Sequence, residues 1–530
     1  MPLAQDLPIN TAATALEMAQ AIFGPGITID PDPTLTTYTG AATASGIYTS
    51  GDTISPELTP GDTGVIFSTG TATNITNNSG TLDTNTATGT TTSHSTTAST
   101  DADFNSLAGG FSVFDVAFLE TTFIPDGNLL TLDFVISSEE YPEFINSNFL
   151  DAVGIWINGT QATVTVGTGE VSVGNINGNT APDLYNDNTA DQFNTEMDGF
   201  TVTLSVVAPV NAGVANTIKI GIADVSDANY DTNLLIAGGS AQSSIVAQDN
   251  SVNIGLGSTK TLNVLDNDFT SSGTLTITEI NGNTVTVGST VTLTSGQEVT
   301  LNADGTFTIL ADADVETVYF NYTVDNGLGG TDTALVQINQ MPCFVAGSLI
   351  ETPRGAVPVE TLRAGDMVNT LDDGPQPIQW IGSRETHANG KFAPIRISAG
   401  SFGAIQDVWL SPQHRVLVRD VWAELLFGEP EVLIKAKDLI NGKSVVAQPS
   451  DGSVTYVHLL FDKHQIVETS GLASESYLPG PMMAHSFDEE AQAEIMTLFP
   501  ELRDVVANAW EAARPILKSH EARALSARAA

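Results

Sequence analysis

Four side chains in the last third of the sequence have the types and spacing needed to cut a peptide bond. Cys343 is the only cysteine among 530 residues, and a thiol that is partly ionised near neutral pH is a strong nucleophile. Its attack on the carbonyl carbon of Pro342 would shift the acyl group from nitrogen to sulfur. His414 is suited to protonate the leaving amide nitrogen, because imidazole titrates near neutral pH. Ser411, three residues earlier, can hydrogen-bond that amide, and His464 can polarise the carbonyl or relay a proton.

Two further side chains are candidates for supporting roles. Asp462 would orient a histidine or activate an incoming nucleophile, and His458 lies four residues before it. Each candidate also has a structural interpretation. A lone cysteine is usually a small buried hydrophobic residue, a buried histidine can be a satisfied core residue, and an acid at a strand end is often only exposed.

The elements that must position these side chains are mostly β-strands. Runs such as "VWLSPQHRVLV" and "TYVHLLFDKHQIVE" favour strands around the candidate residues. Near the start, "TAATALEMAQAIFG" predicts one helix capped by Thr11. The Thr- and Ser-rich residues 68–100 predict a long surface loop. The sequence therefore predicts a mainly β, multidomain protein with four parts: a β-sandwich-like module (1–245), a small antiparallel immunoglobulin-like sandwich (246–340), a β-rich module (341–480) and a helical tail (481–530).

The distribution of positive charge along the chain changes at Cys343. Residues 1–342 contain 38 acids and only two cations, Lys219 and Lys260, whereas the remaining 188 residues hold 24 acids and 16 cations. Such asymmetry indicates modules of different origin. The net charge of −44 argues against nucleic acid or an anionic membrane as a partner. The sequence has no run of 18 apolar residues, so it predicts no membrane-spanning helix.

Three motifs resemble a Hint module, the self-processing fold of hedgehog C-terminal domains and inteins. The stretch "CFVAGSLIETPRGAVPVETLRAGDMV" is similar to its first block, "LSPQHRVLV" to the block in which Ser or Thr precedes His by three, and "HLLFDKHQIV" to the last block. The resemblance covers residues 343 to about 480. It implies a horseshoe-shaped β fold and a single-turnover, cysteine-dependent cut of the chain's own 342–343 bond, without a required cofactor.

The sequence departs from the Hint pattern at three places. Pro342 stiffens the acyl side of the bond, and His458 stands where the last block usually has Asp. The terminal His-Asn that inteins use for splicing is absent. We therefore expect a thioester at Cys343 that is hydrolysed or passed to an external nucleophile or surface acceptor, rather than splicing.

Two weaker resemblances lie upstream. Residues 8–245 are similar to the choice-of-anchor L domain of bacterial surface proteins, through "GVIFSTGTA", "SSEEYPEF" and "YDTNLLIAGG". Residues 246–340 resemble a cadherin-like or VCBS-type immunoglobulin-like repeat, through "VLDNDF" and "YTVDNGLGG". Acidic clusters in both modules allow Ca²⁺ binding by carboxylates, with a solvated acidic face as the alternative; the acids are Glu139, Glu140, Glu143, Asp224, Asp227, Asp231, Asp266 and Asp268.

These features support two classes of function. The first is an exported, acidic, bacterial-type surface or extracellular protein whose Hint module cleaves before Cys343. The second is a non-enzymatic adhesion or matrix protein whose Hint module is an inactive scaffold. A polysaccharide-binding module is a third option. Aromatic residues make up only 7% of the chain, and no group of them is evident that could form a flat surface for sugar rings. The N-terminus lacks the basic segment of a signal peptide, so we expect export by another route.

Overall fold

The structure is a computed structural model of the 530-residue chain. It describes a mainly β protein with four α-helices in its described part, which confirms the predicted fold class. The described residues are 4–78, 93–94, 97–147, 149–162, 164–166, 169–255, 258–312, 317–341, 344–388, 393–412, 414–450, 452–476, 512–517, 521–522 and 525.

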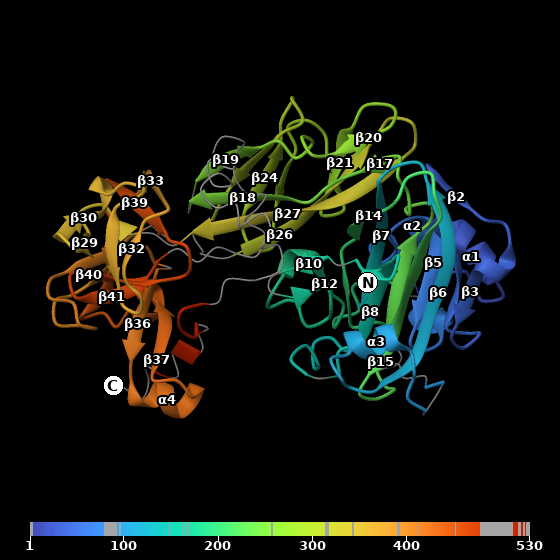
Figure 1. The fold of residues 1–530 in the computed structure, drawn as a ribbon, viewed down its shortest axis with the longest axis horizontal. Coiled ribbons are helices and arrows are strands. Elements are labelled where there is room, and N and C mark those ends of the chain that lie inside the picture. Colours follow the sequence, from blue (N-terminus) through green and yellow to red (C-terminus); the bar gives the residue numbers. More distant parts are fainter. Residues whose placement is uncertain are drawn as a thin grey trace.

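The N-terminal module has two main sheets packed face to face (Figure 1) and a short hairpin of β10 (Thr165–Val166) and β11 (Gly169–Glu170). The first sheet has the order β1-β4-β5-β16-β7-β13-β12, with β14 also paired to β7, and the second has the order β2-β6-β15-β8-β9, with β3 paired to β6. The strands of the first sheet are β1 (Ile9–Asn10), β4 (Ser45–Thr49), β5 (Thr63–Ser68), β7 (Leu129–Ser138), β12 (Tyr185–Asp187), β13 (Gly199–Thr201), β14 (Leu204–Pro209) and β16 (Thr232–Ala237). Those of the second are β2 (Ile27–Ile29), β3 (Thr36–Thr39), β6 (Val113–Pro125), β8 (Ala152–Ile157), β9 (Thr160–Gln161) and β15 (Asn216–Val225).

Alternation along the two longest central strands explains the sandwich. On β15, Ile218, Ile220 and Ile222 enter the core between the sheets, because successive side chains of a strand point to opposite faces. On β7, Phe134 enters the same core, whereas its neighbour Val135 packs in a second cluster on the other face of the sheet. Both faces of β7 are therefore covered, and nearly the whole strand is buried.

The first helix begins later than the sequence predicts. Helix α1 (Ala15–Ile22) is capped by Thr14, whose hydroxyl accepts the Glu17 N–H while the Glu17 carboxylate accepts the Thr14 N–H. The prediction of Thr11 as the cap was wrong, because only Thr14 has an acid three residues later to complete a capping box. The module's other helices are α2 (Gly51–Ile54) and α3 (Ala102–Leu107). Of the predicted loop 68–100, residues 79–92 and 95–96 lie outside the described part.

The second module is a small sandwich with one unexpected pair. Its sheets have the orders β18-β27-β26-β21-β22 and β19-β25-β24-β23, beside the short pair β17-β20. The first and last long strands, β18 and β27, pair in parallel, so the predicted wholly antiparallel arrangement was wrong. The strands are β17 (Ile245–Val246), β18 (Asn250–Gly255), β19 (Thr259–Leu262), β20 (Phe269–Thr270), β21 (Thr276–Ile280), β22 (Asn283–Thr284), β23 (Thr290–Thr292), β24 (Glu298–Leu301), β25 (Phe307–Leu310), β26 (Thr317–Asp325) and β27 (Thr331–Met341).

The first two modules share a buried interface (Figure 1). Tyr319 and Leu335 belong to strands of the second module, yet both are buried in the hydrophobic core of the first. Asp332, fully buried, accepts the Thr131 hydroxyl at 2.9 Å and the Ala247 N–H at 2.6 Å. The two modules are therefore held together by core packing as well as by the chain connection.

The third module combines two sheets around one core. The orders are β33-β39-β28-β35-β34-β38 and β30-β29-β40-β41-β36-β37, with β31 and β32 joining the second sheet. Helix α4 (Val421–Phe427) follows β36. The strands are β28 (Phe344–Val345), β29 (Leu349–Thr352), β30 (Gly355–Pro358), β31 (Met367–Thr370), β32 (Gly374–Pro377), β33 (Trp380–His387), β34 (Ile395–Ile397), β35 (Val408–Leu410), β36 (Arg415–Arg419), β37 (Glu431–Lys435), β38 (Val445–Ala447), β39 (Ser453–Leu460), β40 (Ile466–Thr469) and β41 (Leu472–Glu475).

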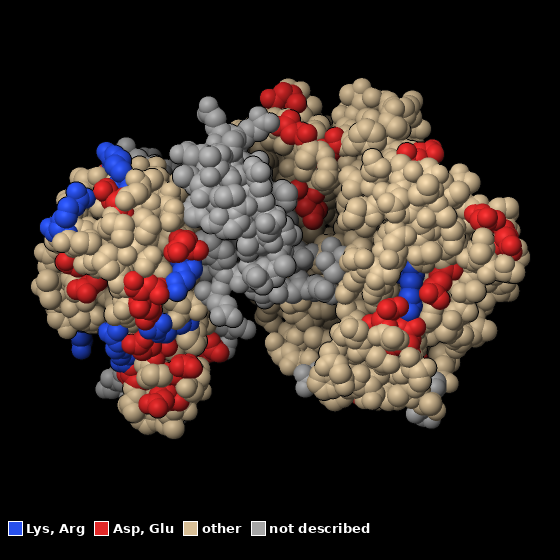
Figure 2. Space-filling model, viewed as in Figure 1, with Lys and Arg blue, Asp and Glu red and all other residues tan. Residues whose placement is uncertain are grey.

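The predicted helical tail lies largely outside the described residues. Residues 477–511 are not described, and residues 512–517 form bends and a single bridge to β37 rather than a helix. Residues 521, 522 and 525 are helical. Within the described part, no helix is long and apolar enough to cross a membrane. Figure 2 shows the blue Lys and Arg side chains concentrated over the third module, as the charge count predicts.

Candidate active site in the third module

The short strand β28 leads away from the predicted cleavage point. Pro342 and Cys343 lie outside the described residues, and Phe344 is the first residue described after them. Phe344 pairs with Leu410 of β35 on one side and with Val457 of β39 on the other, both antiparallel. The chain directions place the residues that follow these partners, Ser411 and His458, on the side of Phe344 that leads to Cys343.

A tight turn holds Ser411 and His414. Strand β35 ends at Leu410, the His414 N–H donates to the Ser411 carbonyl at 3.1 Å, and β36 begins at the next residue. Both side chains are buried, and the His414 ring lies edge-on against the Phe344 ring with 4.4 Å between centroids. The sequence spacing of three is thus the span of one turn, which brings the predicted proton donor against the residue that follows Cys343.

A buried carboxylate, Glu475, contacts His464 and lies within electrostatic reach of His414, and no motif in the sequence predicted it. It is fully buried at the end of β41. Its oxygens accept the Arg415 N–H at 3.0 Å and the Arg415 guanidinium at 2.8 Å. His464 Nε2 lies 3.4 Å from the same carboxylate. Burial alone would raise the pKa of Glu475, but Arg415 first, and then the nearby His464 and His414, outweigh it and lower that pKa to about 2.

The remaining predicted residues divide between the buried region and the surface. His458 is buried on β39 next to Val457, with its ring 6.5 Å from that of Trp380. Asp462 is exposed in the loop between β39 and β40, beside Lys463, which forms an ion pair with Asp373 at 2.9 Å. The described structure therefore gathers His414, His464 and Glu475, and leaves Asp462 at the surface.

The other ring nitrogen of His464 is held by residues far along the chain. The backbone N–H of Ala513 donates to His464 Nδ1 at 3.0 Å. An N–H can only donate, so Nδ1 must accept, and the neutral ring carries its proton on Nε2, facing Glu475. No local sequence motif predicts the role of Ala513, because it contacts His464 through its backbone N–H rather than through a side chain.

In the N-terminal module, the structure brings two of the predicted acidic clusters together. The Glu139 N–H donates to the Asp231 carbonyl at 3.2 Å, and Asp151, which the sequence analysis missed, donates its N–H to Glu140 at 3.2 Å. Asp224, near the end of β15, is the fifth acid of this group and acts electrostatically on Asp151. All five acids are buried. Glu143 and Asp266 are exposed, and Asp227 is half-buried.

Burial and mutual repulsion disturb these carboxyl groups. Burial, reinforced by the charge of Asp227, raises the pKa of Glu140 to about 8. Burial and the neighbouring acids raise the pKa values of Asp151 and Asp224 well above the ordinary range. In the second module, Asp268 accepts the Tyr322 hydroxyl at 3.1 Å, which is a structural contact.

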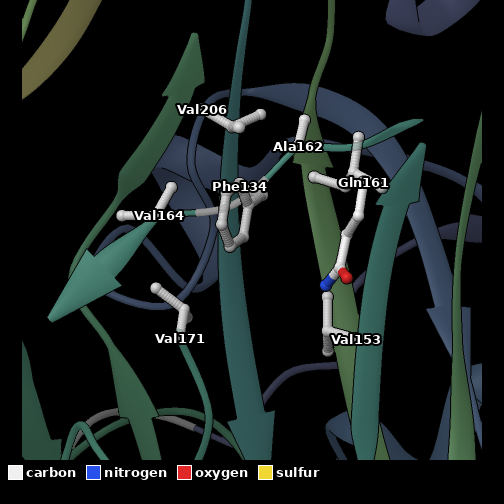
Figure 3. A pocket seen from close by; sticks show the side chains of 8 residues that line it. Phe134, Val153, Gln161, Ala162, Val164, Val171 and Val206 are labelled. Atoms are coloured by element: carbon white, nitrogen blue, oxygen red, sulfur yellow. The ribbon is translucent and has the colours of Figure 1, made fainter. Parts of the chain in front are cut away.

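A small cavity between the sheets of the N-terminal module offers little chemistry. Figure 3 shows Phe134, Val164, Val171 and Val206 around it, with Gln161 contributing a polar group. Its volume is about 30 Å³, enough for one or two water molecules. It is therefore a packing gap of the core rather than a ligand site.

Comparison with protein families confirms the three resemblances. A Hint domain model matches residues 342–481, a choice-of-anchor L domain model matches residues 9–242, and a bacterial Ig domain model matches residues 241–339. No curated protein sequence matches the chain significantly. The match to the Hint family includes His414, His464 and Glu475, whereas Ala513 lies beyond it.

Among solved structures, the chain is similar to a bacterial intein-like domain from Clostridium thermocellum. That match has 19% identity and a TM-score of 0.20, and it covers 26% of this chain and 98% of the domain. The catalytic domain of Clostridium perfringens ZmpB with two CBM51 domains matches at 9% identity and a TM-score of 0.13, over 69% of this chain and 34% of that one. Extracellular domains 3–5 of Drosophila OTK match at 10% identity and a TM-score of 0.15, over 68% and 90%.

Proposed function

We propose that the Hint domain cuts its own chain between Pro342 and Cys343. The observation that carries the proposal is the position of Phe344. This residue immediately follows Cys343, pairs with the residue before Ser411, and packs its ring against His414. In this proposal His414, the general acid, contacts the residue that follows the nucleophile in the sequence.

The reaction consists of an acyl shift and its resolution. The Cys343 sulfur attacks the Pro342 carbonyl carbon, the bond from that carbon to the Cys343 nitrogen breaks, and His414 gives the leaving nitrogen a proton. The products of this step are a thioester at Cys343 and a free amine. Water or an external nucleophile then attacks the thioester carbon, and the thiol leaves with a proton. In the proposed reaction Ser411 and His458 contact the amide, and His464 supports the site through Glu475.

Intact-mass measurement of freshly expressed protein tests the proposal. Wild type should yield fragments 1–342 and 343–530, and added thiol or hydroxylamine should speed their appearance, because these reagents attack acyl sulfur. Cys343→Ala should stay whole. His414→Ala should slow the first step by roughly 10²–10⁴, the contribution of a general acid, and His464→Ala should slow it less.

The outcome separates the proposal from its rival. Correctly folded wild type that remains one chain after long incubation with thiol would leave the Hint domain as an inactive scaffold in an adhesion or matrix protein. In that case, replacing Pro342 with Gly and His458 with Asp tests whether the two departures from the Hint pattern block the reaction.

We further propose that the protein works at the cell surface or outside the cell. The choice-of-anchor L match, the single cysteine and the strongly acidic upstream modules support this location. Immunodetection in fractionated cells of the native host tests it, and protein confined to the cytosol would contradict it. In this setting the acyl acceptor would be water, a small nucleophile or a surface molecule.

A further inference from the structure

A segment beyond the Hint match is docked on the third module. Residues 513–517, here called the docking segment, run beside β37 in parallel: the Leu433 N–H donates to Pro515 at 2.8 Å and the Leu517 N–H donates back to Leu433 at 3.0 Å. Leu517 is buried in the module's core. The docking segment therefore adds to the edge of the third module's second sheet, next to its outermost strand β37.

Ion pairs fix the same segment at its other end. Arg514 Nε lies 2.6 Å from Glu431, and its terminal nitrogen lies 2.8 Å from Asp372. Ala513 and Ile516 pack against a cluster that includes Ile466, two residues from His464. Because Arg514 and Pro515 are held in this way, the neighbouring Ala513 N–H points at His464 Nδ1.

The two nitrogens of His464 therefore have different partners on opposite sides. Nδ1 accepts from Ala513, and Nε2 faces Glu475, which also binds both the backbone and the guanidinium of Arg415. Arg415 is the residue after His414. The contacts thus run from the docking segment through His464 and Glu475 to the turn that carries the proposed general acid.

We propose that Ala513 and Glu475 are positioning groups, which hold His464 as its Nε2–H tautomer and thereby fix the His414 turn. The inference rests on the proposed cleavage only for its kinetic consequence. The docking segment lies after the scissile bond, so it remains attached to the Hint fragment, and the site depends on chain that the Hint family match does not include.

The decisive measurement is the tautomer of His464. Full-length Cys343→Ala protein, which cannot cleave, is labelled with ¹⁵N-histidine, and the His464 signals are assigned with His464→Gln. The Nδ1 and Nε2 shifts should report a proton on Nε2. Ala513→Pro removes the donor N–H and should give a mixture of tautomers, whereas Ala512→Pro, the same change one residue outside the segment, should keep the wild-type pattern.

Kinetics supplies the second readout in protein that retains Cys343. Ala513→Pro should slow thiol-induced cleavage roughly three- to tenfold, the effect of one lost hydrogen bond, and Glu475→Gln should also slow it. Ala513→Pro could release the whole docking segment rather than only the one hydrogen bond. Leu517→Ala and Arg514→Ala weaken the docking through other contacts. Both variants should therefore also shift His464 toward a mixture of tautomers.

Two results would overturn the inference: an unchanged His464 tautomer in Ala513→Pro, or equal disturbance by Ala512→Pro. Failure of wild type to cleave would refute the proposed function but leave the tautomer result to decide this one.

Discussion

Replacing Glu140 with Gln should stabilise the N-terminal module at neutral pH. Glu140 is 2% exposed, and its carboxyl pKa is raised from 4.5 to about 8, first by burial and then by Asp227. A carboxyl with a raised pKa in the folded state favours folding at low pH, and this stability is lost as pH rises from 4.5 toward 8. At pH 7 the loss is 2.5 pH units at 1.36 kcal/mol each, or about 3 kcal/mol.

The matched control lies in the same acidic stretch. Glu143 is exposed, so Glu143→Gln should change stability by less than about 0.5 kcal/mol. Glu140→Gln keeps the oxygen that accepts the Asp151 N–H while removing the charge. The expected result is about 3 kcal/mol of added stability at pH 7 and little change near pH 4.5.

Urea titrations of the full chain provide the assay, with hydrogen-exchange mass spectrometry of peptides from β7 and β15 following the N-terminal module alone. The reasoning is refuted if wild type is equally stable at pH 5 and pH 7, or if Glu140→Gln destabilises the module at pH 7.

Calcium offers a second way to relieve the same repulsion, and we propose Glu140, Asp151 and Asp224 as its carboxylate ligands. One oxygen each of Asp151 and Asp224 is buried without a hydrogen-bond partner. Among the described residues, no three acids already stand at metal-ligand spacing, so binding requires these side chains to rotate. Calcium should stabilise wild type at pH 7 through preferential binding to the folded state and should affect Glu140→Gln less. Equal stability in calcium and chelator at matched ionic strength would exclude the site.

Three further changes probe the packing. Glu475→Gln should lower the free energy of unfolding of the third module by about 3 kcal/mol at neutral pH. The reason is that the lowered pKa of Glu475 gives stability that is present above pH 4.5 and lost as pH falls toward 2. A urea titration that follows β36 peptides checks this, and a wild-type stability that does not change between pH 4.5 and pH 2 would contradict it. Leu335→Ala should cost about 2–5 kcal/mol and lower the unfolding midpoints of the first two modules together, whereas exposed Leu328→Ala should not; separate midpoints in wild type would argue against a shared core. Phe344→Ala should slow cleavage by releasing His414, and an unchanged rate by intact mass would remove the ring contact from the mechanism.

Local sequence signals predicted the strands best. The run "VWLSPQHRVLV" contains β35 and most of β36, and "TYVHLLFDKHQIVE" contains most of β39 and β40, because β-branched and apolar residues favour buried strands. The helix was predicted at the right place but with the wrong cap, since two threonines, Thr11 and Thr14, precede it and only Glu17 distinguishes Thr14.

The site was less accessible to sequence reasoning because its supports are distant in the chain. His414 and Ser411 could be named from a motif that spans one turn. Glu475 lies 61 residues after His414, and nothing in "GLASES" marks its glutamate as buried. Ala513 acts through a backbone N–H that every residue but proline has. Asp151 likewise joins the acids near Glu140 only through the pairing of strands.

The spacing between β27 and β28 determines what a transferred product would look like. Strand β27 ends at Met341 and β28 begins at Phe344, so a cut before Cys343 would leave one residue, Pro342, beyond the sheet of the second module. An acceptor joined there would have no flexible tether. The first two modules, which share a core, would then be mounted on that acceptor as one stiff projecting unit, with their orientation set by the final strand.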